Sequence, residues 1–416
     1  MADSFLYNEA VEYYNKEQYL EAYKIWSKMT DDSDALYFAA YILYKHNIGV
    51  EKRWNTAFNL FKASSELGNH KSTFYCGYLL EKVFGEKYYD SAFDYYYKAL
   101  INEVENSLDG IKRLASLGGK TAQAFLGWAY RCGQYGFEKN YDMAEKWSIL
   151  AFENGERYDA PEQLAWIYKA NNDYSKALSF FKIAAEEGND SVYGPIGDLY
   201  RWGRYGVRKN YTEALRWYDK GAETGHEDAS FFLGYMHLKG MGCKKNKEKA
   251  LQCFDAVVNG NDPQSICNLA TVYYEGVEGI HDPHYAIKLL EKADMKGNTN
   301  ASVLLGVILY EGENIIQDYA KAFELFEKAE SNPRAQEYLG LCYYFGHGCK
   351  KNETLAKHYF LKSFRNGNKS ASKYLTNDLD LKPYSKWDMN EKGAEIIGGA
   401  VSFIFGAILS SFGNND

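Results

Sequence analysis

A short pattern of residues recurs along most of this sequence. An apolar residue precedes a small residue, and Tyr often follows three positions after the small one. The clearest small residues are 32 to 38 positions apart, and they are Gly127, Ala165, Gly197, Gly234, Ala270, Gly306 and Gly340, with weaker copies at Ala40 and Gly77. A fixed period in this range is typical of repeat proteins built from one supersecondary unit.

A second landmark follows each of these. It is an Ala with a large, mostly aromatic residue four positions later, a spacing that places both on one face of a helix. Each repeat is therefore predicted to hold two amphipathic helices. The large residues of the second helices are Trp26, Phe61, Tyr96, Phe181, Tyr218, Phe254, Leu290, Phe326 and Phe360.

Polar residues and glycines mark the ends of the second helices. Asn or Asp stands four positions before the repeated Ala, where its side chain can accept hydrogen bonds from unpaired first-turn N–H groups. These residues are Asn140, Asp173, Asn210, Asn246, Asp282, Asp318 and Asn352. Each helix is predicted to stop at a left-handed glycine. The glycines are Gly68, Gly155, Gly188, Gly225, Gly260, Gly297 and Gly367.

One hairpin of two helices cannot bury its apolar face alone, so neighbouring hairpins must stack. The small residue lets the two helices of a hairpin cross closely, and the large residue of the second helix fills the adjacent hole. The sequence predicts an all-α solenoid, a right-handed superhelix of about ten helical hairpins, followed by a C-terminal hydrophobic helix.

The repeat spacing also predicts the domain organisation. Residues 1–97 hold the N-terminal hairpins and residues 121–375 the main array. Between them, Ala92 and Ala144 are 52 positions apart, so residues 98–120 should contain an inserted helix, placed within residues 103–117. Residues 376–392 are predicted to be a linker, and residues 393–416 a tail helix rich in small residues.

Composition and motifs narrow the function. A net charge of −8 argues against a nucleic-acid partner, which requires a basic footprint. The seven cysteines form no C-x-x-C pair and suit buried thiols in a reducing compartment. Because no signal peptide or catalytic motif is present, we expect a cytoplasmic protein that is not an enzyme and needs no cofactor or metal.

The repeats resemble the Sel1-like repeat, a relative of the tetratricopeptide repeat. Ser191–Gly225 follows the family pattern closely, with Ile196-Gly197, Tyr200, Gly206-Val207, Ala214 and Trp217-Tyr218 in place. The resemblance covers roughly residues 1 to 375. It implies a scaffold or adaptor without catalytic residues, whose first helices line a concave groove.

Counting one and four positions from the small residues gives Tyr41, Tyr44 and Tyr78 at the weaker copies. In the main array it gives the candidate groove residues Trp128, Arg131, Trp166, Lys169, Asp198, Arg201, Tyr235 and Tyr274. Tyr and Trp are favoured anchors for partners. Arg131, Lys169 and Arg201 occupy equivalent positions, and this predicts a basic ladder for an extended peptide with acidic residues. The alternative is that the aromatic residues are core and the three cations are solvated.

The tail carries a separate signal. Ile396–Phe412 has 17 residues and no charge, and small residues recur every fourth position, at Gly398, Ser402, Gly406 and Ser410. That spacing lets helices pack closely in membranes or with another copy. Three interpretations stay open: a helix that caps the solenoid, a membrane anchor at the inner face of a membrane, or a docking helix.

The main hypothesis is an adaptor that binds a partner protein or peptide along its concave, aromatic-lined face. One alternative is a membrane-associated effector whose tail inserts and oligomerises. The other is an immunity or antitoxin protein that masks a toxin.

Overall fold

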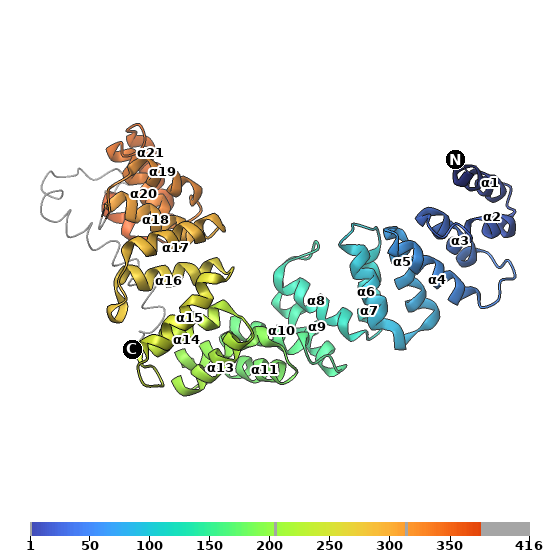
Figure 1. The fold of residues 1–416 in the computed structure, drawn as a ribbon, viewed down its shortest axis with the longest axis horizontal. Coiled ribbons are helices and arrows are strands. Elements are labelled where there is room, and N and C mark those ends of the chain that lie inside the picture. The colour runs from blue at the N-terminus through green and yellow to red at the C-terminus, as the bar shows by residue number, and fades with distance from the viewer. Residues whose placement is uncertain (1, 204–205, 313–314, 376–416) are drawn as a thin grey trace, which may run out of the picture. The chain divides into compact units, whose positions relative to one another are not determined.

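The computed structural model describes residues 2–203, 206–312 and 315–375, and within these ranges every regular element is helical (Figure 1). The predicted all-α solenoid of stacked hairpins is confirmed. The chain forms two compact units, one ending at Val192 and the other beginning at Tyr193, inside the predicted main array. Each unit is described separately below.

The first unit contains five hairpins and one additional helix among its described residues. In chain order its elements are α1 (Ala2–Asn15), α2 (Tyr19–Trp26), α3 (Ser33–Lys45), α4 (Arg53–Glu66), α5 (His70–Leu79), the π-helix η1 (Leu80–Phe84), the 3₁₀ turn η2 (Glu86–Tyr88), α6 (Tyr89–Leu100), α7 (Ser107–Ser116), α8 (Lys120–Cys132), α9 (Tyr141–Glu153), α10 (Asp159–Ala170), α11 (Tyr174–Glu186) and η3 (Asp190–Val192).

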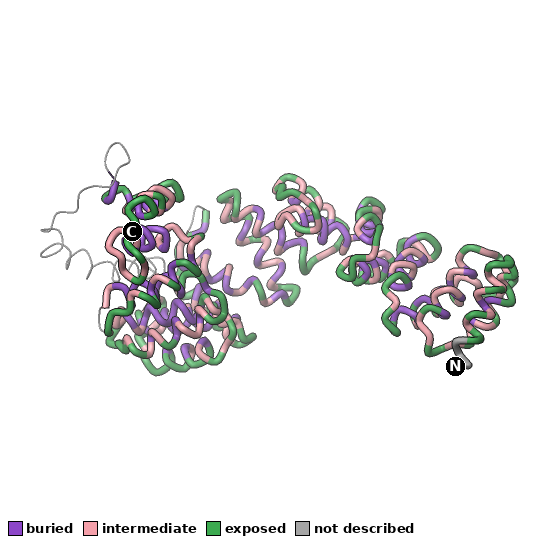
Figure 2. Tube along the Cα trace, turned by 90° about the horizontal axis from the view of Figure 1, so that it is seen from above, coloured by how far each residue is buried: buried purple, intermediate pink, exposed green. Residues whose placement is uncertain are grey.

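The second unit contains five further hairpins in its described part. Its elements are α12 (Tyr193–Trp202), α13 (Tyr211–Glu223), α14 (Glu227–Lys239), α15 (Lys247–Asn259), α16 (Pro263–Glu275), η4 (Val277–Gly279), α17 (Pro283–Met295), α18 (Thr299–Glu311), α19 (Tyr319–Lys328), α20 (Pro333–Phe345), α21 (Glu353–Arg365) and η5 (Lys369–Tyr374). In both units the buried residues follow the inner faces of the helices (Figure 2).

The predicted capping residues begin the second helices as expected. In all seven cases the side-chain oxygen accepts a hydrogen bond from the backbone N–H three residues later. Six of the seven predicted stop glycines have positive φ, between 84° and 96°. Gly260 is the exception, with φ −79° and ψ −174°. A Cβ there would meet the Glu227 side chain, which would have to move.

The predicted close crossing of the two helices is confirmed in four hairpins of the second unit. A Cβ added at Gly197, Gly234, Gly306 or Gly340 would lie 2.6 to 2.7 Å from the aromatic ring of the second helix. Those rings are the predicted ones, Tyr218, Phe254, Phe326 and Phe360. In these four hairpins a methyl group would come too close to the ring unless the helices moved apart, so glycine suits the crossing.

The helix expected between residues 103 and 117 is α7, and a buried carboxylate holds it. Glu81 lies on the π-helix that extends α5, and its carboxylate accepts two hydrogen bonds from the Arg113 guanidinium of α7, at 3.1 and 3.0 Å. The Tyr96 hydroxyl of α6 donates a third, at 2.6 Å. Gly110 of α7 packs on the Tyr96 ring, so the insertion extends the core of the third hairpin.

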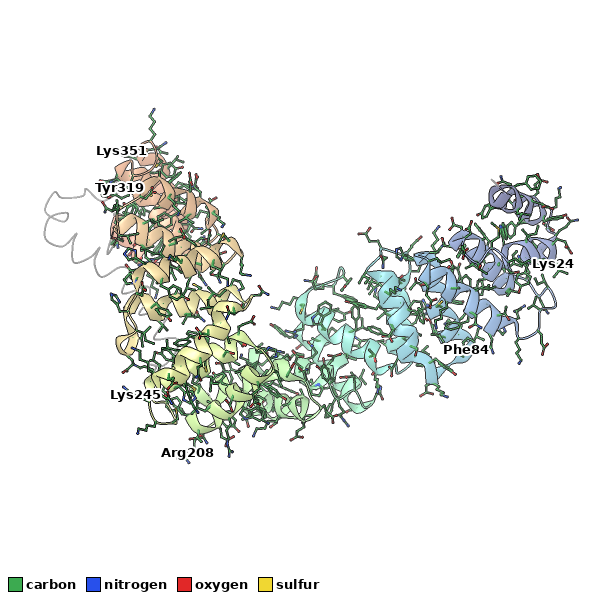
Figure 3. The ribbon with its side chains drawn as sticks, in the orientation of Figure 1. Lys24, Phe84, Arg208, Lys245, Tyr319 and Lys351 are labelled. Carbon is green, nitrogen blue, oxygen red and sulfur yellow. The ribbon has the colours of Figure 1, made fainter. Side chains whose placement is uncertain are left out.

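The π-helix ends at Phe84, which is labelled in Figure 3. The ring centroid of Phe84 lies 6.0 Å from that of Phe58 and 5.8 Å from that of Tyr88, so the Phe84 ring covers the junction between α4 and η2. Gly85 follows with φ 82°, a conformation in which a side chain would be strained. This turn sends the chain into α6.

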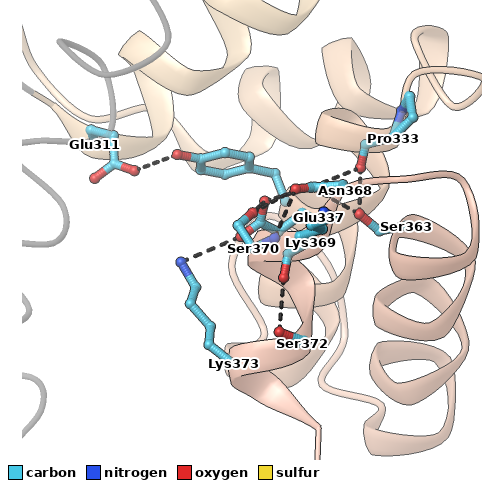
Figure 4. A network of polar contacts seen from close by, with 10 residues as sticks. Glu311, Pro333, Glu337, Ser363, Asn368, Lys369, Ser370, Ser372 and Lys373 are labelled. Atoms are coloured by element: carbon cyan, nitrogen blue, oxygen red, sulfur yellow. Dashed lines mark hydrogen bonds and ion pairs between the residues drawn. The ribbon is translucent and has the colours of Figure 1, made fainter.

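A 3₁₀ turn ends the described part of each unit, and in both an Asn side chain donates to a Glu and accepts from a Ser hydroxyl. At η5, the buried Glu337 carboxylate accepts hydrogen bonds from Asn368 Nδ2 (2.7 Å) and Ser370 Oγ (2.6 Å), and it pairs with Lys373 (Figure 4). At η3, Asn189 Nδ2 donates to Glu162 over 2.9 Å. Both turns begin within a shared Gly-Asn-x-Ser sequence.

The predictions for the linker and the tail fall outside the described residues. They concern residues 376–392, the hydrophobic segment 393–416 and its small residues Gly398, Ser402, Gly406 and Ser410. Among the helices that the structure does describe, none combines the length and apolarity that crossing a membrane requires.

Candidate functional site

Two of the predicted site residues lie on α8 with part of their surface exposed. The Trp128 ring packs beside Phe125 and Tyr135, at centroid distances of 5.8 and 6.0 Å. Arg131, one turn later, donates from Nε to Gln163 Oε1 of α10 over 2.7 Å. The guanidinium thus bridges two successive first helices and still reaches solvent.

Trp166 and Lys169 occupy the corresponding face of α10. The Trp166 indole donates from Nε1 to Glu162 Oε1 (3.1 Å) and meets the Phe181 ring edge-on at 5.2 Å. Lys169 Nζ lies 4.6 Å from the centre of the Trp166 ring. Both side chains are partly exposed, so α10 presents an indole and a cation together.

In the second unit, the predicted cation of the ladder is buried. Arg201 is 3% exposed, donates to Asp198 over 2.9 Å, and stacks at 4.0 Å on the Phe232 ring. Asp198 also accepts from the Tyr218 hydroxyl at 2.6 Å. Burial, followed by the charge of Asp198, raises the pKa of Tyr218 well above its ordinary value.

The remaining predicted site residues, Tyr235 and Tyr274, are each 5% exposed. Both belong to the largest core cluster of the second unit, and Tyr235 stacks on Phe231 at 6.2 Å. Among the predicted site residues, Asp198 therefore contacts Arg201, and Trp166 contacts Lys169. Tyr235 and Tyr274 are buried in the hydrophobic core.

A second aromatic surface lies on α3 and α5 of the first unit. We call it the tyrosine face, and it consists of Tyr37, Tyr41 and Tyr44 of α3 with Tyr75 and Tyr78 of α5. All five side chains are half-buried. The α3 residues are four and three positions apart and share one side of the helix.

The five rings contact one another across the two helices. Tyr75 lies against all three α3 tyrosines, with ring centroids 6.0 Å from Tyr37, 5.7 Å from Tyr41 and 5.4 Å from Tyr44. Tyr44 meets Tyr78 nearly perpendicular at 5.7 Å. Edge and tilted contacts of this kind favour a fixed arrangement of rings.

Three phenols of the tyrosine face resist ionisation, and Lys45 places a cation 5.7 and 5.0 Å from the centres of the Tyr41 and Tyr44 rings. Burial, and then the neighbouring tyrosines, raise the pKa of Tyr37 and of Tyr75 above their ordinary values. The pKa of Tyr44 is raised in the same way. The phenols of Tyr37, Tyr44 and Tyr75 therefore stay protonated and offer hydroxyl groups beside apolar ring surface, a combination suited to binding a polypeptide.

Tyr41, Tyr44 and Tyr78 stand one or four positions after small residues, so the counting rule finds them. It misses Tyr37 and Tyr75, which precede the small residues Ala40 and Gly77. Extending the helical face by one turn would have found Tyr37, because it is four positions before Tyr41.

The described ranges contain no group of three or more His, Cys, Asp or Glu side chains positioned to hold a metal ion. All seven cysteines lie within these ranges and have free thiols. Burial raises the pKa of Cys267 to about 12, so this thiol is not a nucleophile at neutral pH.

Comparison with known families identifies the repeat. A family model described as "Sel1 repeat" matches residues 120–156, 168–189, 194–226, 227–256, 263–298, 299–332 and 333–368, which together exceed half of the chain. The matched segments follow the hairpins from α8 to α21.

Curated relatives match shorter stretches. The ERAD-associated E3 ubiquitin-protein ligase component HRD3B of Arabidopsis thaliana is 30% identical over 119 residues, which are 28% of this chain and 18% of that protein. The chitin synthase regulator SKT5 of Saccharomyces cerevisiae is 25% identical over 251 residues, 51% of this chain and 36% of that protein. The chain thus spans well under two thirds of these relatives.

A solved structure supports the fold. The Sel1 repeat protein from Oxalobacter formigenes is similar with a TM-score of 0.52 and 22% identity, covering 80% of this chain and 92% of that one. At this identity the likeness concerns the fold alone.

Proposed function

This chain belongs to the Sel1 repeat family, and on that premise we propose that it is a non-catalytic adaptor that binds a partner protein along the first helices of its hairpins. The names of its relatives describe a ligase component and an enzyme regulator, which supports an accessory role. A repeat array supplies an extended surface for this purpose.

The tyrosine face is the single observation that carries the proposal. Five tyrosines on α3 and α5 are half-exposed, although burying aromatic side chains is favourable. Tyr is enriched among residues that dominate binding energy, because its ring is large, rigid and polar at one end. We therefore assign this face as the main contact with an extended segment of the partner.

A second contact follows from α8 and α10. Arg131 and Lys169 keep exposed surface beside Trp128 and Trp166, so they can pair with a carboxylate while the indoles cover its apolar neighbours. The proposed basic ladder rests on these two cations. Arg201, buried on Asp198, is left out of it.

Affinity capture from cells, followed by titration of the purified partner, tests the proposal. The test variant replaces Tyr41, Tyr44 and Tyr78 by Ala. A matched control replaces Tyr88 and Tyr158, exposed tyrosines of the same unit that lie outside the face. We expect the test variant to lose the partner, with at least a tenfold weaker Kd, while the control binds as the parent does.

Equal binding by the parent and the test variant would refute the tyrosine face as the contact. Charge reversal at Arg131 and Lys169 should weaken binding further and reduce its dependence on salt. Circular dichroism of every variant checks that the helices are intact.

A further inference from the structure

A cavity of about 750 Å³ adjoins one end of the tyrosine face. It lies among the first turns of α3 and α5 and the loop between α6 and α7, so all of its walls belong to the first unit. Tyr37, Phe74 and Tyr75 supply aromatic surface within it. The cavity continues the face that the proposed function assigns to a partner segment.

Carboxylates surround this aromatic surface. Asp34 comes from the first turn of α3, and Glu103 and Glu105 come from the α6–α7 loop. All three side chains are exposed. The basic side chain of Lys71 also lines the cavity, so acidic groups outnumber the lysine by three to one.

The loop that carries the two glutamates is held in place by backbone hydrogen bonds. The Glu103 N–H donates to the carbonyl of Leu100, and the Val104 N–H donates to that of Ala99, both at an N–O distance of 3.0 Å. Glu103 takes the left-handed conformation, with φ 57°. This loop connects α6 to the inserted helix α7. The insertion therefore supplies one wall of the cavity, and a regular repeat would have no such loop.

Helix N-termini also approach the cavity and would favour an anion if their N–H groups were free. At α3 and α5 side-chain caps take up part of this capacity, whereas α7 begins after Asn106 without a side-chain cap. The Asp32 carboxylate accepts from the N–H groups of Asp34 and Ala35, and the Asn69 side chain accepts from that of Ser72. The three carboxylates, set against one lysine, favour a cation.

We propose that this cavity receives an arginine side chain of the bound partner segment. A guanidinium stacks flat on aromatic rings and pairs with carboxylates in its own plane, so it uses both kinds of wall. A lysine ammonium would use the carboxylates but stack less well. The inference rests on the proposed function and adds the chemistry that the partner must carry next to the tyrosine face.

Saturation-transfer NMR on the full chain tests this directly. The probe is the peptide acetyl-Gly-Ser-Arg-Ser-Gly-amide, compared with versions that carry citrulline, lysine or glutamate in place of arginine. Citrulline keeps the shape of arginine without its charge. We expect arginine to bind at least fivefold more tightly than citrulline, with lysine between them and glutamate weakest.

The test variant combines Asp34→Asn, Glu103→Gln and Glu105→Gln. It should remove most of the preference for arginine, because each exposed carboxylate should contribute about two- to fivefold to the affinity. The matched control combines Glu138→Gln, Asp142→Asn and Glu153→Gln, which changes the net charge equally, at exposed sites outside the cavity. The control should keep the preference.

Equal binding of arginine and citrulline peptides, tighter binding of glutamate, or equal losses in the two variants would overturn the inference. The two proposals fail separately. If the tyrosine variants release the partner but the arginine peptide shows no preference, the adaptor function stands without the arginine site. If the peptide shows the preference but the tyrosine variants retain the partner, the assigned face is wrong.

Discussion

The guanidinium of Arg113 donates two hydrogen bonds to the carboxylate of Glu81, at 3.1 and 3.0 Å, and so fastens the inserted helix to the third hairpin. The Glu81 side chain has no exposed surface, whereas that of Arg113 is 38% exposed. Lys82 and the Tyr96 hydroxyl also contact the carboxylate, and together with Arg113 they compensate a buried charge that would otherwise be strongly destabilising.

Replacing Arg113 by Ala should loosen α7. We expect the local stability to fall by about 2 to 3 kcal/mol. This loss is at or below the lower end of the range for broken buried ion pairs, because Arg113 is partly solvated. Hydrogen exchange of the α7 backbone amides measures it. Lys112→Ala is the control, since Lys112 pairs with the exposed Asp109 and lies 5.3 Å from the centre of the Phe137 ring, so its removal leaves the Arg113–Glu81 pair in place. Equal exchange in both variants would contradict the prediction.

The stability of this region should depend on acid. Burial alone would raise the pKa of Glu81, but hydrogen bonds from Arg113, Lys82 and Tyr96 outweigh it and hold the pKa below the ordinary 4.5. The ionised carboxylate therefore stabilises the fold above about pH 4.5, and this contribution is lost as the pH falls through the lower folded-state pKa.

Hydrogen exchange of α7 between pH 6 and pH 3, corrected for intrinsic rates, checks the acid dependence. Glu81→Gln should flatten the fall in protection, while the exposed Glu138→Gln should leave it unchanged. A parent protein whose α7 protection does not fall over this range would show the prediction to be wrong.

Adding one methyl group at Gly306 should strain the hairpin of α18 and α19. The new Cβ would lie 2.7 Å from the buried Phe326 ring, so Gly306→Ala should lower the free energy of unfolding by about 1 to 3 kcal/mol. Combining it with Phe326→Leu should cost less than the sum of the two single changes, because the smaller side chain leaves room. Strict additivity in urea unfolding would argue against this contact.

The 3₁₀ turn η5 should depend on the amide of Asn368. Asn368→Ala removes a donor from the buried Glu337 carboxylate and from the Pro333 carbonyl, and we expect it to cost about 1 to 3 kcal/mol. Faster hydrogen exchange in residues 369–375 is the readout. Ser372→Ala is the control, since its hydroxyl bonds only the exposed carbonyl of Lys369.

The helices, their caps and the glycine–aromatic contacts could be predicted because each depends on residues close together in the sequence. Gly306 and Phe326 are 20 positions apart within one hairpin, and the repeat period fixes their pairing. The candidate site was only partly predictable. Tyr41, Tyr44 and Tyr78 followed from the counting rule, but the same rule selected Arg201, Tyr235 and Tyr274, which the structure buries.

The sequence by itself determined the repeat, the hairpin and the close crossing at small residues, since these follow from helical periodicity and capping. Tertiary structure alone decided which equivalent positions stay exposed. Arg201 pairs with Asp198, whereas Arg131 and Lys169 stay partly exposed. The loop before the inserted helix brings Glu103 to the cavity that Tyr37 and Tyr75 also line. The physical reason is that exposure depends on how neighbouring hairpins pack, and that packing is set by contacts between residues more than 30 positions apart.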